Sequence, residues 1–159
     1  MKKICTLLLL ISTLSFAQKN KSTAPPAQPP FTAAEKRLQG FDTRKQLNEN
    51  SLVKEVEFRS VGPTIMSGRV VDVDANPNDP TQFYVAYASG GLWRTDNNGM
   101  SFTPLFDNEA VMTIGDIAVD WNRNIIWIGT GENNSSRSSY SGAGLYKSTD
   151  GGKTWSNKG

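Results

Sequence analysis

Ser148–Trp155 has the sequence Ser-Thr-Asp-Gly-Gly-Lys-Thr-Trp, and these eight residues contain what a tight turn between two strands requires. Asp150 can accept hydrogen bonds from backbone N–H groups just ahead of it. Gly152 supplies the positive φ of a tight turn, and Thr154 and Trp155 resume a strand. The stretch therefore predicts a β-hairpin.

A weaker copy of this stretch occupies residues 95–102, with the sequence Thr-Asp-Asn-Asn-Gly-Met-Ser-Phe. The register continues upstream, where 91–94 (Gly-Leu-Trp-Arg) matches 144–147 (Gly-Leu-Tyr-Lys). A spacing of about 50 residues is typical of one repeating supersecondary unit. The corresponding residues are Thr95, Asn97, Gly99 and Phe102 in the first copy and Ser148, Asp150, Gly152 and Trp155 in the second.

The pattern Ser-x-Asp-x-Gly-x-Thr-Trp resembles the Asp-box, or BNR repeat, of the sialidase and sortilin type of β-propeller. The segments 67–69 (Ser-Gly-Arg), 90–93 (Gly-Gly-Leu-Trp) and 129–134 (Gly-Thr-Gly-Glu-Asn-Asn) are also similar to large secreted bacterial proteins described as sortilin N-terminal-domain proteins or BNR-repeat "glycosyl hydrolases". The resemblance covers about residues 53–159. It implies an all-β propeller with ligand contacts on one face, and family membership does not by itself imply a reaction.

Residues 1–17 have the features of a secretory signal peptide. Lys2 and Lys3 precede a short apolar run at 7–14, and small residues lead to cleavage after Ala17. The run is too short to span a membrane, and the alternative is a buried N-terminal helix. We therefore expect a secreted, periplasmic or cell-surface protein with no transmembrane segment.

Removal of residues 1–17 changes the chemistry that the chain can support. The chain has no histidine, and its single cysteine, Cys5, is removed. Disulfides, thiol nucleophiles and histidine bases are therefore excluded within this stretch. The formal charge falls from +2 to neutral, so nucleic acid is not an expected partner. No cofactor is expected, and no contiguous metal-ligand loop is present.

Residues 18–52 are expected to form a linker and a short helical segment. Prolines dominate 18–31, while Thr32–Glu35 reads as a capping box that opens a helix. Gly40 would end this helix, and 44–52 would add another helical turn or two. From residue 53 onward, alternation at 56–58 predicts a half-buried strand.

The remaining sequence predicts about two four-stranded blades, at 68–108 and 111–159. A propeller closes with about four to eight such sheets, so the chain is expected to be the N-terminal part of a longer protein whose further blades are needed for folding. The expected strands of the first blade are 69–74, 82–88, 91–95 and 101–106. Those of the second are 113–120, 124–130, 144–148 and a strand beginning at 154.

The order of strands in a blade assigns the candidate residues to two opposite sides of the propeller. The hairpins between third and fourth strands, which carry both Asp-boxes, lie on one side, so these residues are interpreted as structural. The opposite side would receive 62–69, 88–90, 107–110 and the long polar loop 132–142. Candidate ligand-binding residues there are Arg69, Glu132, Asn133, Asn134, Arg137 and Tyr140. The alternative is a solvated loop in which Glu132 and Arg137 pair only with each other.

Three functions remain open on the sequence. Glycoside hydrolysis usually needs two carboxylates about 5 to 10 Å apart. Resemblance to xyloglucan-cleaving propellers would place one of them at Ala88, where a methyl group stands, and Glu132 is the single weak catalytic candidate. A sialidase would need an arginine triad and a tyrosine nucleophile spread over several blades, of which the first blade supplies only the arginines Arg69 and Arg94, and most of the triad could lie beyond residue 159. The preferred function is non-catalytic binding of a polypeptide or carbohydrate, and a purely structural envelope or secreted protein shares every feature.

Overall fold

The computed structural model describes residues 31–59, 68–132 and 140–159. The expected signal peptide and almost all of the proline-rich stretch lie outside the described residues. The helix and both sheets belong to one compact unit. Within the described part of the chain, no helix is both long enough and apolar enough to span a membrane.

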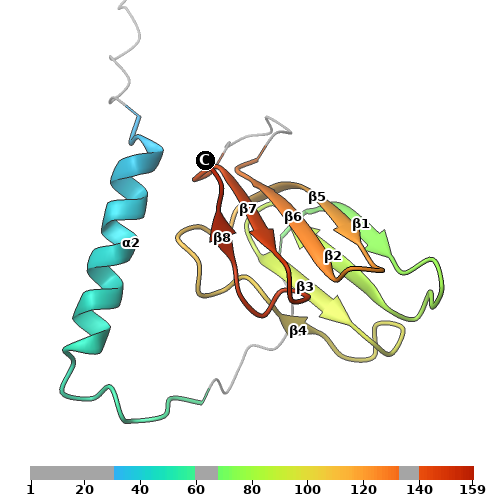
Figure 1. Cartoon of the computed structure of the whole chain (residues 1–159), viewed down its shortest axis with the longest axis horizontal. Coiled ribbons are helices and arrows are strands. Elements are labelled where there is room, and N and C mark those ends of the chain that lie inside the picture. Colours follow the sequence, from blue (N-terminus) through green and yellow to red (C-terminus); the bar gives the residue numbers. More distant parts are fainter. Residues whose placement is uncertain (1–30, 60–67, 133–139) are drawn as a thin grey trace, which may run out of the picture. The chain divides into compact units, whose positions relative to one another are not determined.

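The structure is mostly β, with two four-stranded antiparallel sheets (Figure 1). In each sheet every strand pairs with the next one along the chain, because short turns join antiparallel neighbours. The first sheet contains β1 (Val70–Ala75), β2 (Phe83–Tyr87), β3 (Gly91–Thr95) and β4 (Thr103–Pro104). The second contains β5 (Ile114–Asp120), β6 (Ile125–Thr130), β7 (Leu145–Ser148) and β8 (Ser156–Asn157).

These sheets confirm the β-rich class and the grouping of the strands, while the described residues show two sheets and no closed ring. The predicted fourth strands are too long. β4 has two residues where 101–106 was expected, and β8 begins at Ser156 where the strand was expected to begin at residue 154. The Asp-box turn bonds occupy the residues just before each of these strands, which leaves little backbone free to pair.

The strands of the two sheets pair in equivalent registers. In each sheet the pairing of the first two strands has an irregularity near its start. In the first sheet the register shifts between Val70 and Asp72. In the second it shifts between Ile114 and Asp116. A bulge of this kind re-aims the side chains that follow it. Asp72 and Asp116 therefore occupy equivalent positions in the two repeats.

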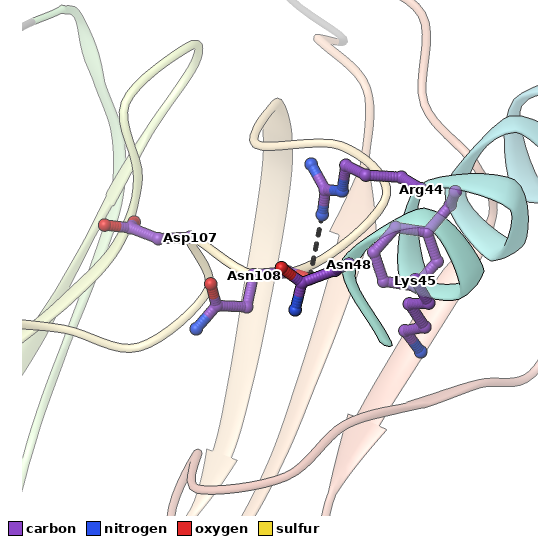
Figure 2. A pocket seen from close by; sticks show the side chains of 6 residues that line it. Arg44, Lys45, Asn48, Asp107 and Asn108 are labelled. Atoms are coloured by element: carbon purple, nitrogen blue, oxygen red, sulfur yellow. Dashed lines mark hydrogen bonds between the residues drawn. The ribbon is translucent and has the colours of Figure 1, made fainter. Parts of the chain in front are cut away.

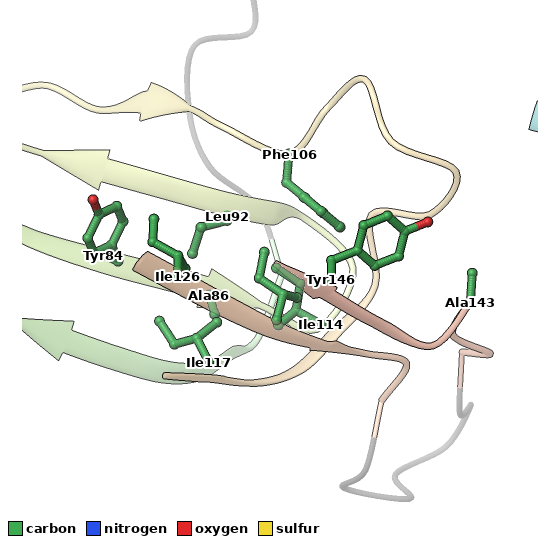
Figure 3. Packing of buried hydrophobic residues seen from close by; sticks show 10 residues of the cluster. Tyr84, Ala86, Leu92, Phe106, Ile114, Ile117, Ile126, Ala143 and Tyr146 are labelled. Carbon is green, nitrogen blue, oxygen red and sulfur yellow. The ribbon is translucent and has the colours of Figure 1, made fainter. Parts of the chain in front are cut away.

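The hydrophobic core lies between the two sheets (Figure 3). Alternate residues of each strand face the partner sheet, as the pleat of a strand requires. Phe106, from the loop after β4, packs edge-on against Tyr146 with ring centroids 5.2 Å apart. The residues buried in this cluster are Tyr84, Ala86, Leu92, Phe106, Ile114, Ile117, Ile126, Ile128, Ala143 and Tyr146.

Three hydrogen bonds join the sheets at the margins of this core. The Ile117 N–H donates to Asp72 Oδ2 at 3.2 Å, and the Trp121 indole N–H donates to Asp74 Oδ1 at 2.6 Å. The Trp155 indole N–H donates to the Leu105 carbonyl at 2.8 Å. Each bond satisfies a polar group beside apolar packing, where an unmet donor or acceptor would be costly.

The helix α2 (Ala34–Glu49) corrects three predictions. It runs through Gly40 without ending, and residues 44–49 belong to this same helix. An interior glycine costs a helix only about 0.5–1 kcal/mol, and the flanking Ala, Glu, Lys, Arg, Leu and Gln are good helix formers. The N-cap is Ala33, with no side-chain capping bond, so the predicted capping box is not formed.

The strand expected from residue 53 onward does not form within the described residues 53–59, and its expected continuation at 60 and 61 lies outside them. Residues 52–56 form turns, in which the Val56 N–H donates to the Val53 carbonyl at 3.0 Å, and 57–59 belong to no helix or strand. Val56 and Phe58 are both exposed. A strand is stabilised by pairing and by burial of one face, so alternation alone did not produce one here.

Candidate functional site

Backbone hydrogen bonds divide the loops into two groups, one at each end of the sheets. At one end, the β3–β4 turn bonds to the β1–β2 turn through Asn98 N–H and Thr81 O at 2.8 Å. The β7–β8 turn bonds in the same way to the β5–β6 turn, from Gly151 N–H to Asn124 O at 3.0 Å. Both Asp-box turns therefore lie at this end, with the other short turns.

In the second Asp-box, the Ser148 hydroxyl sits at the centre of the turn. It accepts the Gly152 N–H at 2.8 Å and donates to Asp150 Oδ1 at 2.8 Å. Asp150 in turn accepts the Thr154 N–H at 2.9 Å and the Thr154 hydroxyl at 2.6 Å. Gly152 has a φ of 91°. The turn is held by a closed network of short-range bonds.

The first Asp-box repeats this network with Thr and Asn. The Thr95 hydroxyl accepts the Gly99 N–H at 2.9 Å and donates to Asn97 Oδ1 at 3.0 Å. Asn97 Oδ1 accepts the Ser101 N–H at 3.0 Å, and its Nδ2 donates to the Ser101 hydroxyl at 2.9 Å. Asn thus makes the same cap as Asp, because its amide supplies both an acceptor and a donor.

The aromatic residues of the two boxes pack differently. Phe102 lies edge-on to Phe83 of its own sheet, with ring centroids 6.0 Å apart. Trp155 reaches the other sheet, where it packs edge-on against Phe106 at 5.1 Å and donates to the Leu105 carbonyl. The contacts made by these side chains, like those of the box hydroxyls and carboxylate, are internal to the protein.

The hydrogen bonds to Asp150 shift its ionisation. The Thr154 hydroxyl, the Thr154 N–H and the Ser148 hydroxyl, in that order, lower the pKa of Asp150 to about 2. All three stabilise the charged form, since a carboxylate accepts stronger hydrogen bonds than a carboxylic acid.

The other end of the sheets brings Arg69 and Glu132 together. Arg69 directly precedes β1, and Glu132 follows β6 by two residues. The Arg69 guanidinium forms an ion pair with Glu132 Oε1. The Glu132 side chain is only 1% exposed, whereas that of Arg69 is 42% exposed. The carboxylate is thus a buried counter-ion, and the guanidinium is the member of the pair that solvent reaches.

The base of the loop after β6 is narrow and fixed by backbone contacts. The Glu132 N–H donates to the Tyr140 carbonyl at 2.9 Å, and the Gly131 N–H donates to the Thr113 carbonyl at 2.9 Å. A Cβ added at Gly142 would overlap the Thr130 carbonyl, so only glycine allows this approach. Glu132 and the exposed Tyr140 are therefore held on facing sides of the loop base.

Of the six predicted ligand-binding residues, the structure places Arg69, Glu132 and Tyr140 at this end. Asn133, Asn134 and Arg137 lie outside the described residues. The ion pair of Glu132 with Arg69 was not foreseen, because the two residues are far apart in the sequence. Ala88 is buried beside this site, and its N–H donates to the Arg69 carbonyl at 2.9 Å.

A cavity of about 440 Å³ lies between α2 and the loop after β4 (Figure 2). Arg44 Nη2 donates to the Asn108 carbonyl at 3.3 Å across it. Burial raises the pKa of Asp107, and burial also raises that of Glu109 against the lowering effect of Lys45 and Arg44. Residues 107–110 were predicted to lie on the ligand side of the sheets, but nothing in the sequence predicted that α2 would line the same cavity, because residues 34–49 have no amphipathic pattern.

The aspartates at the junction of the sheets were also missed. A hydrogen bond to the Asp72 carboxyl raises the pKa of Asp116, and burial raises it by a smaller amount. The available signal was an aspartate interrupting an otherwise apolar strand at the same place in each repeat, in Val-Val-Asp-Val and Ile-Gly-Asp-Ile. Among the described residues, no group of three or more His, Cys, Asp or Glu is placed to hold a metal ion.

A scan against protein-family models finds no match to the chain, and a search of curated proteins finds none either. The Arg69–Glu132 pair and its surroundings are then the basis for a functional assignment.

Proposed function

We propose that residues 68–159 contribute two blades to an Asp-box β-propeller of the sialidase and sortilin type. Two observations support the proposal. Consecutive strands pair in both sheets with equivalent registers, and the turns Thr95–Phe102 and Ser148–Trp155 are held by matching hydrogen-bond networks. Such networks are what a repeated turn of defined conformation requires. Further sheets are needed to complete the ring.

We propose further that this propeller binds a polypeptide or glycan ligand without catalysis by this chain. The observation that carries the proposal is the burial of Glu132 against Arg69. A general acid or base must come within hydrogen-bond distance of the group whose proton it exchanges. Glu132 is 1% exposed and ion-paired with Arg69, an environment that favours a counter-ion over a group that exchanges a proton with a substrate.

The same arrangement suits recognition. Glu132 neutralises part of the charge of Arg69 and fixes its orientation, and the guanidinium has five N–H donors, so others remain for a ligand. These donors suit carboxylates, peptide carbonyls or sugar hydroxyls. The exposed ring of Tyr140 adds an apolar surface with a polar tip, which can stack on a sugar or on a side chain.

The test compares two arginines that both form ion pairs but lie at opposite ends of the sheets. Arg69→Ala should abolish binding of the full protein to xyloglucan oligosaccharides, sialyllactose or a mixed peptide panel, whichever the wild type binds in titration calorimetry. Arg123→Ala, which removes the Arg123–Asp120 pair at the Asp-box end, should leave that binding unchanged. Equal binding by wild type and Arg69→Ala would refute the site.

The alternative, a glycoside hydrolase whose catalytic carboxylates lie partly beyond residue 159, has its own outcome. Release of reducing sugar by the full protein, lost in Glu132→Gln, would refute the non-catalytic proposal. Under that proposal Glu132→Gln releases Arg69 from its counter-ion and weakens ligand binding, with no hydrolysis in either protein.

We also propose that the protein is exported and cleaved after Ala17. The support is the arrangement of lysines, apolar run and small residues in 1–17. N-terminal sequencing of the protein recovered from medium or envelope should begin at Gln18, and a retained Met1 would contradict export by this route.

A further inference from the structure

A second cleft, of about 270 Å³, lies between α2 and the face of the second sheet that is turned toward the first sheet. Tyr146 of β7 is buried on that face, and Asn157 of β8 pairs directly opposite it, so both side chains lie on the same face. Trp155, which also lines the cleft, packs against Phe106 of the first repeat. A further sheet in a longer chain would pack on the opposite face, so it would leave this cleft open.

One side of α2 forms the other wall of the cleft. Residues spaced i, i+3, i+4 and i+7 lie on one side of a helix. The α2 residues with this spacing that line the cleft are Leu38, Phe41, Asp42 and Lys45. The Lys45 ammonium lies 4.2 Å from the centroid of the Phe41 ring, so its charge is held at this wall.

Two arginines hold α2 in place over the cleft. Arg37 Nη1 donates to the Gly142 carbonyl at 2.6 Å, and two turns further along the helix Arg44 Nη2 donates to the Asn108 carbonyl at 3.3 Å. Both acceptors are backbone groups of loops that leave the sheets. The two walls of the cleft are therefore joined by hydrogen bonds as well as by apolar contact.

The Tyr146 hydroxyl is buried at this cleft without an acceptor for its proton. The residue is 2% exposed, and within the described part of the chain no hydrogen bond of ordinary geometry reaches the hydroxyl. Asn157 approaches it, but Nδ2 of that amide donates to the Ala143 carbonyl at 2.6 Å and Oδ1 accepts the Gly159 N–H at 2.9 Å. Figure 3 shows the Tyr146 hydroxyl directed away from the rest of the buried cluster. An unpaired buried hydroxyl is unfavourable, so a ligand that pairs with it gains affinity.

Glu109 supplies the other half of a hydrogen-bonding site. It lines the same cleft. Burial raises the pKa of Tyr146, Asn157 lowers it, and the nearby Glu109 carboxylate raises it. A ligand group between these two side chains must accept from the Tyr146 O–H and donate to the Glu109 carboxylate. A carboxylate cannot donate and an ammonium cannot accept, whereas an alcohol hydroxyl does both.

The rest of the cleft suits the carbon skeleton of a sugar. The rings of Phe41 and Trp155 provide apolar surface, and the exposed Asp42 and Lys45 provide an acceptor and a donor. Ligand pockets begin at about 300 Å³, so a cleft of this size suits one sugar ring rather than an extended chain.

We propose that this cleft binds one sugar ring of a glycan, with a sugar hydroxyl that accepts a hydrogen bond from Tyr146 and donates one to Glu109. Trp155 then has two roles, because it joins the sheets and also forms part of a ligand site. The cleft shares no lining residue with the Arg69–Glu132 pair, so this proposal does not rest on the ligand proposed there.

Saturation-transfer difference NMR of the full protein tests the proposal. The protein carries Arg69→Ala, so that a ligand at Arg69 does not contribute. The probes are the methyl glycosides of D-glucose, D-galactose, D-mannose and N-acetyl-D-glucosamine, each titrated separately. At least one of them should receive saturation from the protein. Acetate has only acceptors and methylammonium has only donors, so neither should displace it.

Two further substitutions in this protein should weaken binding of the sugar. Tyr146→Phe removes only the hydroxyl, and it should weaken binding about tenfold. It should leave resistance to urea unchanged or increased, because the group that it removes is unpaired. Glu109→Gln keeps the size of the side chain and replaces a charged acceptor by a neutral amide, so it should also weaken binding. Tyr84→Phe removes another buried tyrosine hydroxyl, in the first sheet, and should bind like the parent protein.

Three outcomes would overturn the proposal. The first is that none of the probes receives saturation, in which case the Tyr146 hydroxyl pairs only with water. The second is that Tyr146→Phe and Glu109→Gln bind the sugar as tightly as the parent protein. The third is a lower resistance of Tyr146→Phe to urea, which would mean that the hydroxyl is already bonded within the protein.

Discussion

Asp150 and Asn97 perform one structural task with and without a charge. Both accept the hydroxyl of the box Ser or Thr and a backbone N–H four residues further on. The difference is that Asp150 accepts the Thr154 hydroxyl, whereas Asn97 donates to that of Ser101. The hydroxyl partner can rotate to suit either, so the turn tolerates both residues.

Asp150→Asn is expected to remove an acid-sensitive contribution to stability. The pKa of Asp150 is lowered to about 2, below the usual value of 3.8, so its ionised form stabilises the fold at neutral pH. That contribution is complete above about pH 4 and is lost as the pH falls through about 2. In urea unfolding at pH 7, 4 and 2.5, the free energy of unfolding of the wild type should exceed that of Asp150→Asn by an amount that decreases as the pH falls.

The reciprocal variant provides the control. Asn97→Asp should acquire the acid dependence that Asp150→Asn loses, because the surrounding donors are the same. An unchanged difference between wild type and Asp150→Asn from pH 7 to pH 2.5 would contradict this account.

At the scale of the element, sequence pattern predicted strands better than it predicted helix ends. The strands were found because apolar alternation and the turn residues of the two boxes agree on the same boundaries. Two predictions failed because each rests on a local rule. One was that Gly40 ends the helix, and the other was that the alternation from residue 53 onward forms a strand. A glycine ends a helix only where a left-handed cap forms, and alternation makes a strand only where a partner strand is present.

Two glycines should respond in opposite directions to substitution by alanine. Nothing beyond the neighbouring backbone of α2 itself lies within 4 Å of the position that a Cβ at Gly40 would take, so Gly40→Ala should stabilise α2 by about 0.5–1 kcal/mol and raise the helical far-UV circular dichroism signal. Gly142→Ala would overlap the Thr130 carbonyl and should destabilise the sheets by about 1–3 kcal/mol in urea unfolding. A gain in stability for Gly142→Ala would show that the loop base is not as tight as described.

At the scale of the whole molecule, the two sheets are joined by aromatic residues and aspartates that local sequence patterns could not pair. Trp121 and Asp74 belong to different repeats, and their contact exists only once one sheet packs on the other. The same is true of Arg69 and Glu132, which were predicted to lie at the same end of the sheets but not to form an ion pair. Topology could predict which end a residue occupies, but the individual contacts depend on side-chain packing across the interface.

The Trp121–Asp74 bond offers a direct measure of how the sheets are coupled. Trp121→Phe keeps a ring beside Tyr84, whose centroid lies 4.8 Å from that of Trp121, but removes the indole N–H. Hydrogen bonds to charged groups contribute about 1.5–3 kcal/mol, and Asp74 is partly hydrated, so a loss near the lower limit is expected. Asp74→Ala should cost a similar amount, since it removes the acceptor.

The double variant decides whether the two residues act together. If the bond is what each single variant loses, Trp121→Phe with Asp74→Ala should cost less than the two single losses added, by about 0.5–3 kcal/mol in urea unfolding. The second sheet already carries Ala118 at the position of Asp74, which shows that this site accepts alanine in a folded strand. Strict additivity would mean that the bond does not couple the sheets, and apolar packing around Tyr84 would then hold them together without it.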